Sequence, residues 1–118
     1  MTRPTSPFAA VLAALIRHRG VTGCMVVGEQ DGILVDSNLQ IGVTGTALAA
    51  LTASLYRKAR RAAAAAGFGE TGFFELDAER GRVCAAGRNE LVLVVVAAER
   101  VNVGLVRVEM LRALEAFA

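Results

Sequence analysis

Apolar side chains recur at helical spacing in three stretches of the chain, and the first of these lies near its start. Ser6 and Pro7 are typical of a helix start, with the serine as cap and the proline at the first helical position. The apolar positions that follow match the i, i+3, i+4, i+7, i+8 template: Phe8, Val11, Leu12, Leu15 and Ile16. Gly20 is placed to cap the end of this helix. The same spacing predicts a last helix over residues 103–117.

Five shorter apolar runs, separated by turn residues, predict β-strands. They cover residues 21–28, 33–37, 71–78, 82–86 and 91–98. Asp31-Gly32 between the first two is a strong hairpin signal, and Gly81 is free to take the positive φ that a turn before the fourth run needs. The last run reads LVLVVVAA. An uninterrupted apolar run of this kind predicts a central strand with helices on both of its faces.

The remaining helical stretch, residues 43–66, is the longest and is apolar on nearly every face. We expect its stripe of Leu48, Leu51 and Leu55 to face the sheet of the same chain, so that Leu51→Ala would cost about 2–5 kcal/mol of stability. The other faces are mostly alanine and threonine up to a basic run at residues 57–61. A helix that is apolar all round is usually buried on more than one side. Because one small domain has only one core, we expect the second burying surface to be another protein.

The order of these elements is helix, two strands, helix, three strands, helix. Consecutive strands joined by short turns imply antiparallel pairing. The sequence therefore predicts an α/β fold, a three-layer α/β/α sandwich around a five-stranded, mainly antiparallel sheet, with order α-β-β-α-β-β-β-α. At 118 residues we expect a single domain over residues 1–118.

The charge balance changes this picture little. Thirteen basic residues face eleven acidic ones, a formal net charge of +2, which is too weak to indicate nucleic-acid binding. The basic run Arg57, Lys58, Arg60 and Arg61 has two interpretations: a solvated helix end, where positive charge suits the helix dipole, or the edge of a partner surface. No secretory signal and no membrane-spanning run is recognisable. We expect a cytoplasmic protein, and the richness in alanine and arginine is associated with bacterial sources.

Candidate chemistry is sparse. Cys24 and Cys84 each lie in an apolar run and are expected to be buried thiols. No cluster of metal-ligand residues is present, and the single histidine, His18, stands between two arginines at a helix end. Gly42 and Gly45 precede a helix but lack the Lys-Ser/Thr pair of a phosphate-binding loop. We therefore expect no catalytic residue, no cofactor and no metal, and a protein that is not an enzyme.

The order and spacing of the motifs resemble the roadblock/dynein light chain family. The first matching motif is GVTGCMVVGEQDGILV, with Gly20 and Val21 before an apolar strand and Asp31-Gly32 at the hairpin. The last is ELVLVVVAAERVNVGLVRVEMLRAL, in which Asn102 and Gly104 lie between an apolar strand and an apolar helix. Together with the alanine-rich second helix, the resemblance covers nearly the whole chain.

The resemblance implies a homodimer, in which the sheets join edge to edge through the third strand and the second helices lie side by side. The dimer-interface residues implied for this chain are Ala49, Ala50, Ala53, Tyr56, Arg60, Phe73, Phe74 and Glu75. It also implies a non-catalytic regulator or scaffold that binds a small Ras-like GTPase, with a possible GTPase-activating role. The clustered candidates for binding that partner are Arg57, Arg60 and Arg61.

A small-molecule sensor of similar sheet-and-helix outline is the alternative. Such a protein binds its ligand in an apolar cavity of several hundred cubic ångströms with a few convergent polar groups. The apolar strands offer few such groups, the nearest being Thr22, Ser37, Cys24 and Cys84. A well-formed cavity between the layers would favour this alternative.

Overall fold

Five antiparallel strands form one sheet in the computed structural model of the chain, which describes residues 6–40 and 44–117. The strands are β1 (Val21–Gly28), β2 (Leu34–Leu39), β3 (Phe74–Ala78), β4 (Gly81–Arg88) and β5 (Leu91–Ala97). Their order across the sheet is β2-β1-β5-β4-β3. The valine-rich β5 is central, as its uninterrupted apolar sequence predicts.

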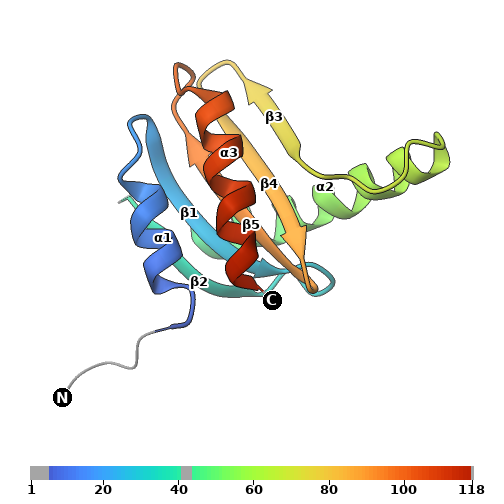
Figure 1. Cartoon of the computed structure of the whole chain (residues 1–118), viewed down its shortest axis with the longest axis horizontal. Helices are drawn as coiled ribbons and strands as arrows, with labels where there is room; N and C mark the ends of the chain where they lie inside the picture. The colour runs from blue at the N-terminus through green and yellow to red at the C-terminus, as the bar shows by residue number, and fades with distance from the viewer. Residues whose placement is uncertain (1–5, 41–43, 118) are drawn as a thin grey trace.

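Three helices cover the two faces of this sheet (Figure 1). They are α1 (Ala9–Ile16), α2 (Gly45–Ala65) and α3 (Val103–Ala113), and a short 3-10 helix, η1 (Leu114–Phe117), continues α3. Helices α1 and α3 lie on one face and α2 lies on the other, with its C-terminal part projecting beyond the sheet. The predicted three-layer fold and the order of its elements are confirmed. The predicted beginning of the second helix at Val43 and the turn at Gly42 lie outside the described residues.

The sheet face under α1 and α3, here called the α1/α3 face, carries the larger of two cores. Cys24, Val95 and Cys84 lie side by side across its three central strands, because Val95 of β5 pairs with Cys24 of β1 and with Cys84 of β4. Large side chains from the helices close over them: Leu12, Leu15, Val106, Met110, Leu114 and Phe117. All of these are buried, so this face is closed within the single chain.

The opposite face, here called the α2 face, is closed by smaller residues. Its strands contribute Met25, Val27, Ala85, Val92 and Val94, and its helix contributes Ala49, Ala53 and Tyr56. All of these are buried. Since alanine carries only a methyl group, the helix backbone lies close to the sheet.

The rotation of α2 is therefore different from the prediction. Leu51 is 64% exposed and Leu55 is 40% exposed, while Leu48 is half-buried and packs at the side of the α2-face core. The sequence contains two stripes at helical spacing, one of leucines and one of Ala49, Ala53 and Tyr56. The second stripe faces the sheet. The expectation that Leu51 is a core residue is wrong for the single chain.

The turn between β1 and β2, residues 29–33, lies directly beneath α2. A Cβ at Gly32 would come within 3.1 Å of the Cα of Ala50, and Gly32 has a φ of +70°. Both facts require glycine there. The turn is longer than the predicted two-residue hairpin: the side chain of Asp31 accepts a hydrogen bond from the backbone N–H of Ile33 at 2.9 Å. The packing of Gly32 against Ala50 brings Glu29 and Gln30 under the second half of the helix.

Candidate functional site

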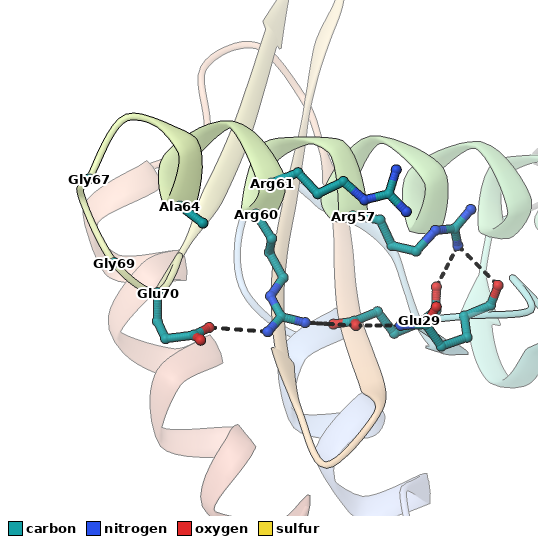
Figure 2. A pocket seen from close by; sticks show the side chains of 9 residues that line it. Glu29, Arg57, Arg60, Arg61, Ala64, Gly67, Gly69 and Glu70 are labelled. Atoms are coloured by element: carbon teal, nitrogen blue, oxygen red, sulfur yellow. Dashed lines mark hydrogen bonds and ion pairs between the residues drawn. The ribbon is translucent and has the colours of Figure 1, made fainter.

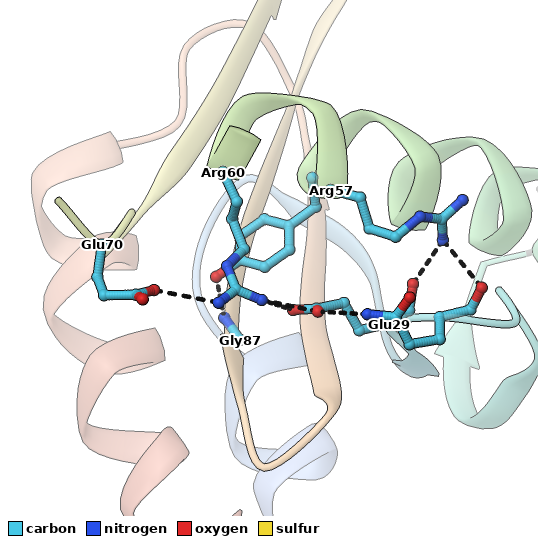
Figure 3. A network of polar contacts seen from close by, with 7 residues as sticks. Glu29, Arg57, Arg60, Glu70 and Gly87 are labelled. Atoms are coloured by element: carbon cyan, nitrogen blue, oxygen red, sulfur yellow. Dashed lines mark hydrogen bonds and ion pairs between the residues drawn. The ribbon is translucent and has the colours of Figure 1, made fainter. Parts of the chain in front are cut away.

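The second half of α2 carries a network of ion pairs centred on Arg60 (Figure 3). Its Nη1 donates to both carboxylate oxygens of Glu29 at 2.7 Å, and its Nη2 donates to Glu70 at 3.1 Å. Glu29 is only 7% exposed, and a buried carboxylate requires a partner of this kind. The hydrogen bond to Glu70, followed by the charge of Glu29, raises the pKa of Arg60 above its usual range. Arg60 thus joins the β1–β2 turn to the loop that follows α2.

Tyr56, one turn earlier, attaches the same helix to β4. Its hydroxyl accepts a hydrogen bond from the backbone N–H of Gly87 at 2.8 Å. Burial is the main reason that the pKa of the Tyr56 phenol is raised. A Cβ at Gly87 would lie 2.9 Å from the tyrosine ring and 3.2 Å from the backbone oxygen of Leu91. The close approach of the ring therefore depends on the glycine.

Arg57 makes a third attachment, which is to backbone carbonyl oxygens and not to a carboxylate. Its Nη1 donates to the carbonyl oxygens of Glu29 at 2.5 Å and Gln30 at 3.2 Å. These are the same turn residues that Arg60 reaches through the carboxylate. The two arginines together fix the second half of α2 over the β1–β2 turn.

An open groove of about 610 Å³ lies between these elements (Figure 2). Here called the arginine groove, it is lined by Glu29, Gln30, Arg57, Arg60, Arg61, Ala64, Gly67, Gly69 and Glu70. Its volume falls in the range of ligand pockets. The groove is open and charged, however, and lies beside α2 instead of between the layers. It therefore lacks the apolar enclosure that the small-molecule alternative requires.

The basic run does not stand at the helix end. Helix α2 continues through Ala65, and its last turn contains no basic residue. The favourable interaction of positive charge with a helix C-terminus falls off within the last turn, so the helix dipole does not account for Arg57 and Arg60. Of the three arginines predicted to bind a partner, these two are engaged within the chain. Arg61 is exposed and makes no hydrogen bond or ion pair among residues 6–40 and 44–117.

The residues predicted for the helix side of a dimer interface are placed differently by the structure. Ala49, Ala53 and Tyr56 are buried against the chain's own sheet, so in the single chain they present no surface to a partner. Arg60 points to Glu29 and Glu70. Only Ala50 of this group is exposed.

The residues predicted for the strand side are distributed over both faces of the sheet. Phe73 packs against the α1/α3-face core, with the guanidinium of Arg107 5.3 Å from its ring centroid. Phe74 packs against the α2-face core. Glu75 pairs with Arg82 at 2.7 Å. None of these side-chain contacts covers the backbone of β3. Its outer edge is open, because β3 pairs only with β4 among the described strands.

Sequence reasoning missed the exposed apolar residues on the α2 side of the molecule. We define the α2–β3 surface as Leu51 and Leu55 on the outward face of α2 together with Leu76, which is 44% exposed on the edge strand. Leu76 lies two positions after Phe74 along β3 and therefore points to the same, α2 side of the sheet. The signal for this surface is present in the sequence as the leucine stripe, which periodicity alone assigns to the core.

The titratable groups outside the arginine groove show no arrangement for catalysis in the part of the chain that the structure describes. Burial raises the pKa of Cys24 to about 12 and that of Cys84 to about 11, which makes both thiols poor nucleophiles. His18 lies 3.9 Å from Glu109, between α1 and α3. Within residues 6–40 and 44–117, no three His, Cys, Asp or Glu residues are grouped so that they could hold a metal ion. Among the helices of that part, none has the length and apolar character needed to cross a membrane.

Comparison with known proteins gives a consistent family. The family model described as Roadblock/LC7 domain matches residues 7–97. Two uncharacterized proteins of Methanocaldococcus jannaschii are each 34% identical to the chain. One match spans 105 residues, covering 89% of this chain and 91% of the relative, and the other spans 103 residues, covering 87% and 90%.

Solved structures share the same fold. MglB of Myxococcus xanthus superposes with a TM-score of 0.85 at 23% identity, covering 98% of this chain and 94% of that one. The gliding protein MglB of Thermus thermophilus gives 0.82 at 20% identity, covering 100% and 93%. A Roadblock/LC7 domain from Streptomyces avermitilis gives 0.80 at 16% identity, covering 92% and 94%.

Proposed function

The chain belongs to the roadblock/LC7 family, and from this premise we propose that it is a non-catalytic regulator or scaffold that forms a homodimer and binds a small Ras-like GTPase. The proposal treats residues 1–118 as one roadblock domain. The observation that carries it is the outward face of α2, where Leu51 is 64% exposed on a helix whose other side is already buried. A second copy of the chain is the partner that would cover this face.

Two leucines of α2 would supply apolar area to the dimer interface. Burying a leucine side chain fully contributes about 1.5–3 kcal/mol, and Leu51 and Leu55 lie one turn apart on the same helix face. In a symmetric dimer each copy supplies both residues. Packing two α2 helices side by side would therefore remove the largest apolar exposure on this helix.

The edge of β3 supports the same assembly. An open strand edge is a template for pairing with another chain and an aggregation hazard unless it is covered. Pairing β3 with its copy would extend the sheet across the dimer and bring Leu76 to the interface. The interface residues that we propose are thus Leu51, Leu55 and Leu76, together with Ala50 from the sequence prediction.

GTPase binding is what the resemblance to the roadblock family implies. Among its structural neighbours, one solved MglB is described as having a tetrameric arrangement, a statement about that protein. If this chain accelerates GTP hydrolysis, it would do so by holding the GTPase's own switch loops in place. Arg57 and Arg60 are engaged with the β1–β2 turn, whereas Arg61 makes no hydrogen bond or ion pair among residues 6–40 and 44–117.

The dimer is tested by light scattering on matched glutamate variants. Leu51→Glu should shift the mass from twice 12.3 kDa to 12.3 kDa, because a charge cannot be buried unpaired at the interface. Leu105→Glu is the control, since Leu105 is 45% exposed on α3 at the opposite face. It should leave the dimer intact. A monomeric native protein, or equal dissociation by both variants, would refute the proposed interface.

The GTPase is tested by pull-down with Ras-like GTPases of the same organism, loaded with GDP or with a non-hydrolysable GTP analogue. We expect retention in one nucleotide state over the other. Absence of retention in both states would reject the GTPase as partner while leaving the dimer untouched. Where binding is found, single-turnover hydrolysis with Arg61→Ala separates the mechanisms: an unchanged rate supports ordering of the switch loops, and a large loss supports a supplied arginine.

A further inference from the structure

The arginine groove has more positive charge than its own carboxylates neutralise. Both of its glutamates, Glu29 and Glu70, are bound to Arg60. Arg57 contacts only carbonyl oxygens, which carry no net charge. Arg61 has no carboxylate partner within residues 6–40 and 44–117. The three arginines and two glutamates that line the groove give it a net charge of +1, and neither Arg57 nor Arg61 contacts a carboxylate in the part of the chain that the structure describes.

The two arginines without a carboxylate contact are neighbours. Arg57 and Arg61 are four positions apart on α2, and like charges at this spacing destabilise a helix. Figure 2 shows Arg61 extending along the helix toward Arg57, and both line the groove. A carboxylate placed between them would relieve the repulsion and accept charge-assisted hydrogen bonds from both.

The charges are distributed unevenly along the groove. Figure 2 shows Glu70 at one end, beyond Arg60, and Arg57 at the other end, beside the β1–β2 turn. The end with Arg57 and Arg61 is positive, whereas the end with Glu70 is negative. An elongated ligand would thus bind with its acidic part at the turn. Long polyanions of uniform charge fit this arrangement poorly, because they would also meet Glu70.

The residues beside the groove indicate a protein ligand. Phe68 is 84% exposed and stands between Gly67 and Gly69, both of which line the groove. Aromatic side chains and arginine are enriched where proteins bind one another. Among the described residues, no aromatic side chain lines the groove itself, so it offers no surface on which nucleic-acid bases would stack.

We propose that the arginine groove binds an acidic segment of a partner protein, with carboxylates of that segment at Arg57 and Arg61. The inference rests on the proposed function only in requiring a protein partner; it does not require that the partner be a GTPase or that the chain be a dimer. It places partner binding beside the second half of α2, on residues other than the leucines of the α2–β3 surface.

The test uses the full chain and a fluorescein-labelled peptide of five Glu-Ala repeats, with five Gln-Ala repeats as the uncharged control. Fluorescence anisotropy is measured at about 0.15 M ionic strength, where the screening length is about 8 Å. The Glu-Ala peptide should bind and the Gln-Ala peptide should not. Arg61→Glu should weaken binding by about tenfold or more, the effect expected of a charged hydrogen bond.

Lys58→Glu is the matched variant, since it makes the same change of charge on the same helix at an exposed residue outside the groove. It should weaken binding less than Arg61→Glu does, because it leaves both guanidinium donors of the groove in place. Equal weakening by both variants, equal binding of both peptides, or no binding of the Glu-Ala peptide would each overturn the proposal. So would tighter, Arg61-dependent binding of oligo-deoxythymidylate or of phosphatidylserine vesicles.

Light scattering on the same samples separates this proposal from the proposed function. A monomer that binds the peptide through Arg61 would refute the homodimer and retain the groove. A dimer that retains a GTPase but ignores the peptide would refute the groove and retain the function.

Discussion

The two faces of the sheet are covered in different ways. On the α1/α3 face, two helices and η1 bring large apolar side chains such as Leu12, Met110 and Phe117 over the strands. On the α2 face, one helix contributes mainly alanine to the core and is attached by hydrogen bonds of Tyr56, Arg57 and Arg60. The core of each face is closed within one chain, but helices on both faces still expose apolar side chains. The most exposed of these is Leu51 of α2, at 64%, against 38–51% for Leu105, Val108 and Leu111 of α3.

The difference explains why α2 turns its leucines outward. A helix held close to a sheet by small residues turns its larger side chains outward, and here those are Leu51 and Leu55. The polar attachments fix this rotation, because Tyr56 and Arg60 reach their partners only when the alanines face the sheet. On the α2 side, the exposed leucines therefore occur together with an exposed arginine, Arg61.

The largest expected effect compares the same substitution on the two sides. Leu12→Ala should cost about 2–5 kcal/mol, since Leu12 is buried in the α1/α3-face core and its removal leaves a cavity. Leu51→Ala should cost less than about 0.5 kcal/mol in the single chain. Urea unfolding at low protein concentration measures both values. Similar losses for the two variants would contradict the rotation of α2 described above.

The polar attachment of α2 is tested next. Arg60→Ala should cost about 1–3 kcal/mol, because it leaves the buried carboxylate of Glu29 without its cation. Arg61→Ala is the control on the adjacent residue and should stay within about 0.5 kcal/mol of the native protein. The double variant Arg60→Ala with Glu29→Gln should recover part of the loss. If Arg60→Ala is as harmless as the control, the ion pair does not hold the helix.

The burial of Cys24 and Cys84 beneath α1 and α3 predicts that the protein loses stability at alkaline pH. Cys24 and Cys84 ionise near pH 9 when unfolded, but burial raises the pKa of the folded thiols to about 12 and about 11. The stability that they contribute is complete below about pH 9 and is lost as the pH rises through the window between the unfolded and folded values. Each thiol should cost about 1.4 kcal/mol by pH 10.

Urea unfolding at pH 8 and pH 10 measures this loss. The variant Cys84→Ala should show a smaller decrease than the native protein over the same interval, because one of the two groups is removed. An identical decrease would show that the thiols are not the groups that titrate.

The smallest expected effect concerns the hydroxyl of Tyr56. Tyr56→Phe keeps the ring in the α2-face core but removes the acceptor for the N–H of Gly87. It should cost about 0.5–1.5 kcal/mol, the net value of a typical hydrogen bond. Amide hydrogen exchange at Gly87 should become faster in the variant. An unchanged exchange rate and stability would mean that this bond does not fix the helix.

Much of the fold could be predicted from the sequence because its signals are local. The period of the apolar residues separates strands from helices, Gly20 and Gly32 mark places where the chain needs a positive φ, and the unbroken apolar sequence of β5 requires cover on both faces. Short connections then leave antiparallel pairing as the available arrangement. The buried state of Cys24 and Cys84 also follows from their apolar surroundings along the chain.

The candidate site could be predicted only in part. The basic run is visible in the sequence, but the partner Glu29 is 31 positions away from Arg60, in a turn where a glutamate is ordinarily solvated. Nothing in the local sequence indicates that α2 covers this turn. The burial of Glu29 is a consequence of the helix packing on Gly32, which is a contact between distant segments.

The sequence by itself determined which segments are helices and strands, their order and the family. Only the tertiary structure decided how α2 is rotated about its axis. Its leucine stripe and its alanine–tyrosine stripe have the same period, so periodicity cannot choose between them. The choice depends on the space between helix and sheet. It also depends on the hydrogen bond that the buried hydroxyl of Tyr56 accepts from the backbone N–H of Gly87. Because that rotation turns Leu51 outward and Arg60 onto Glu29, it also decides which residues remain for a partner.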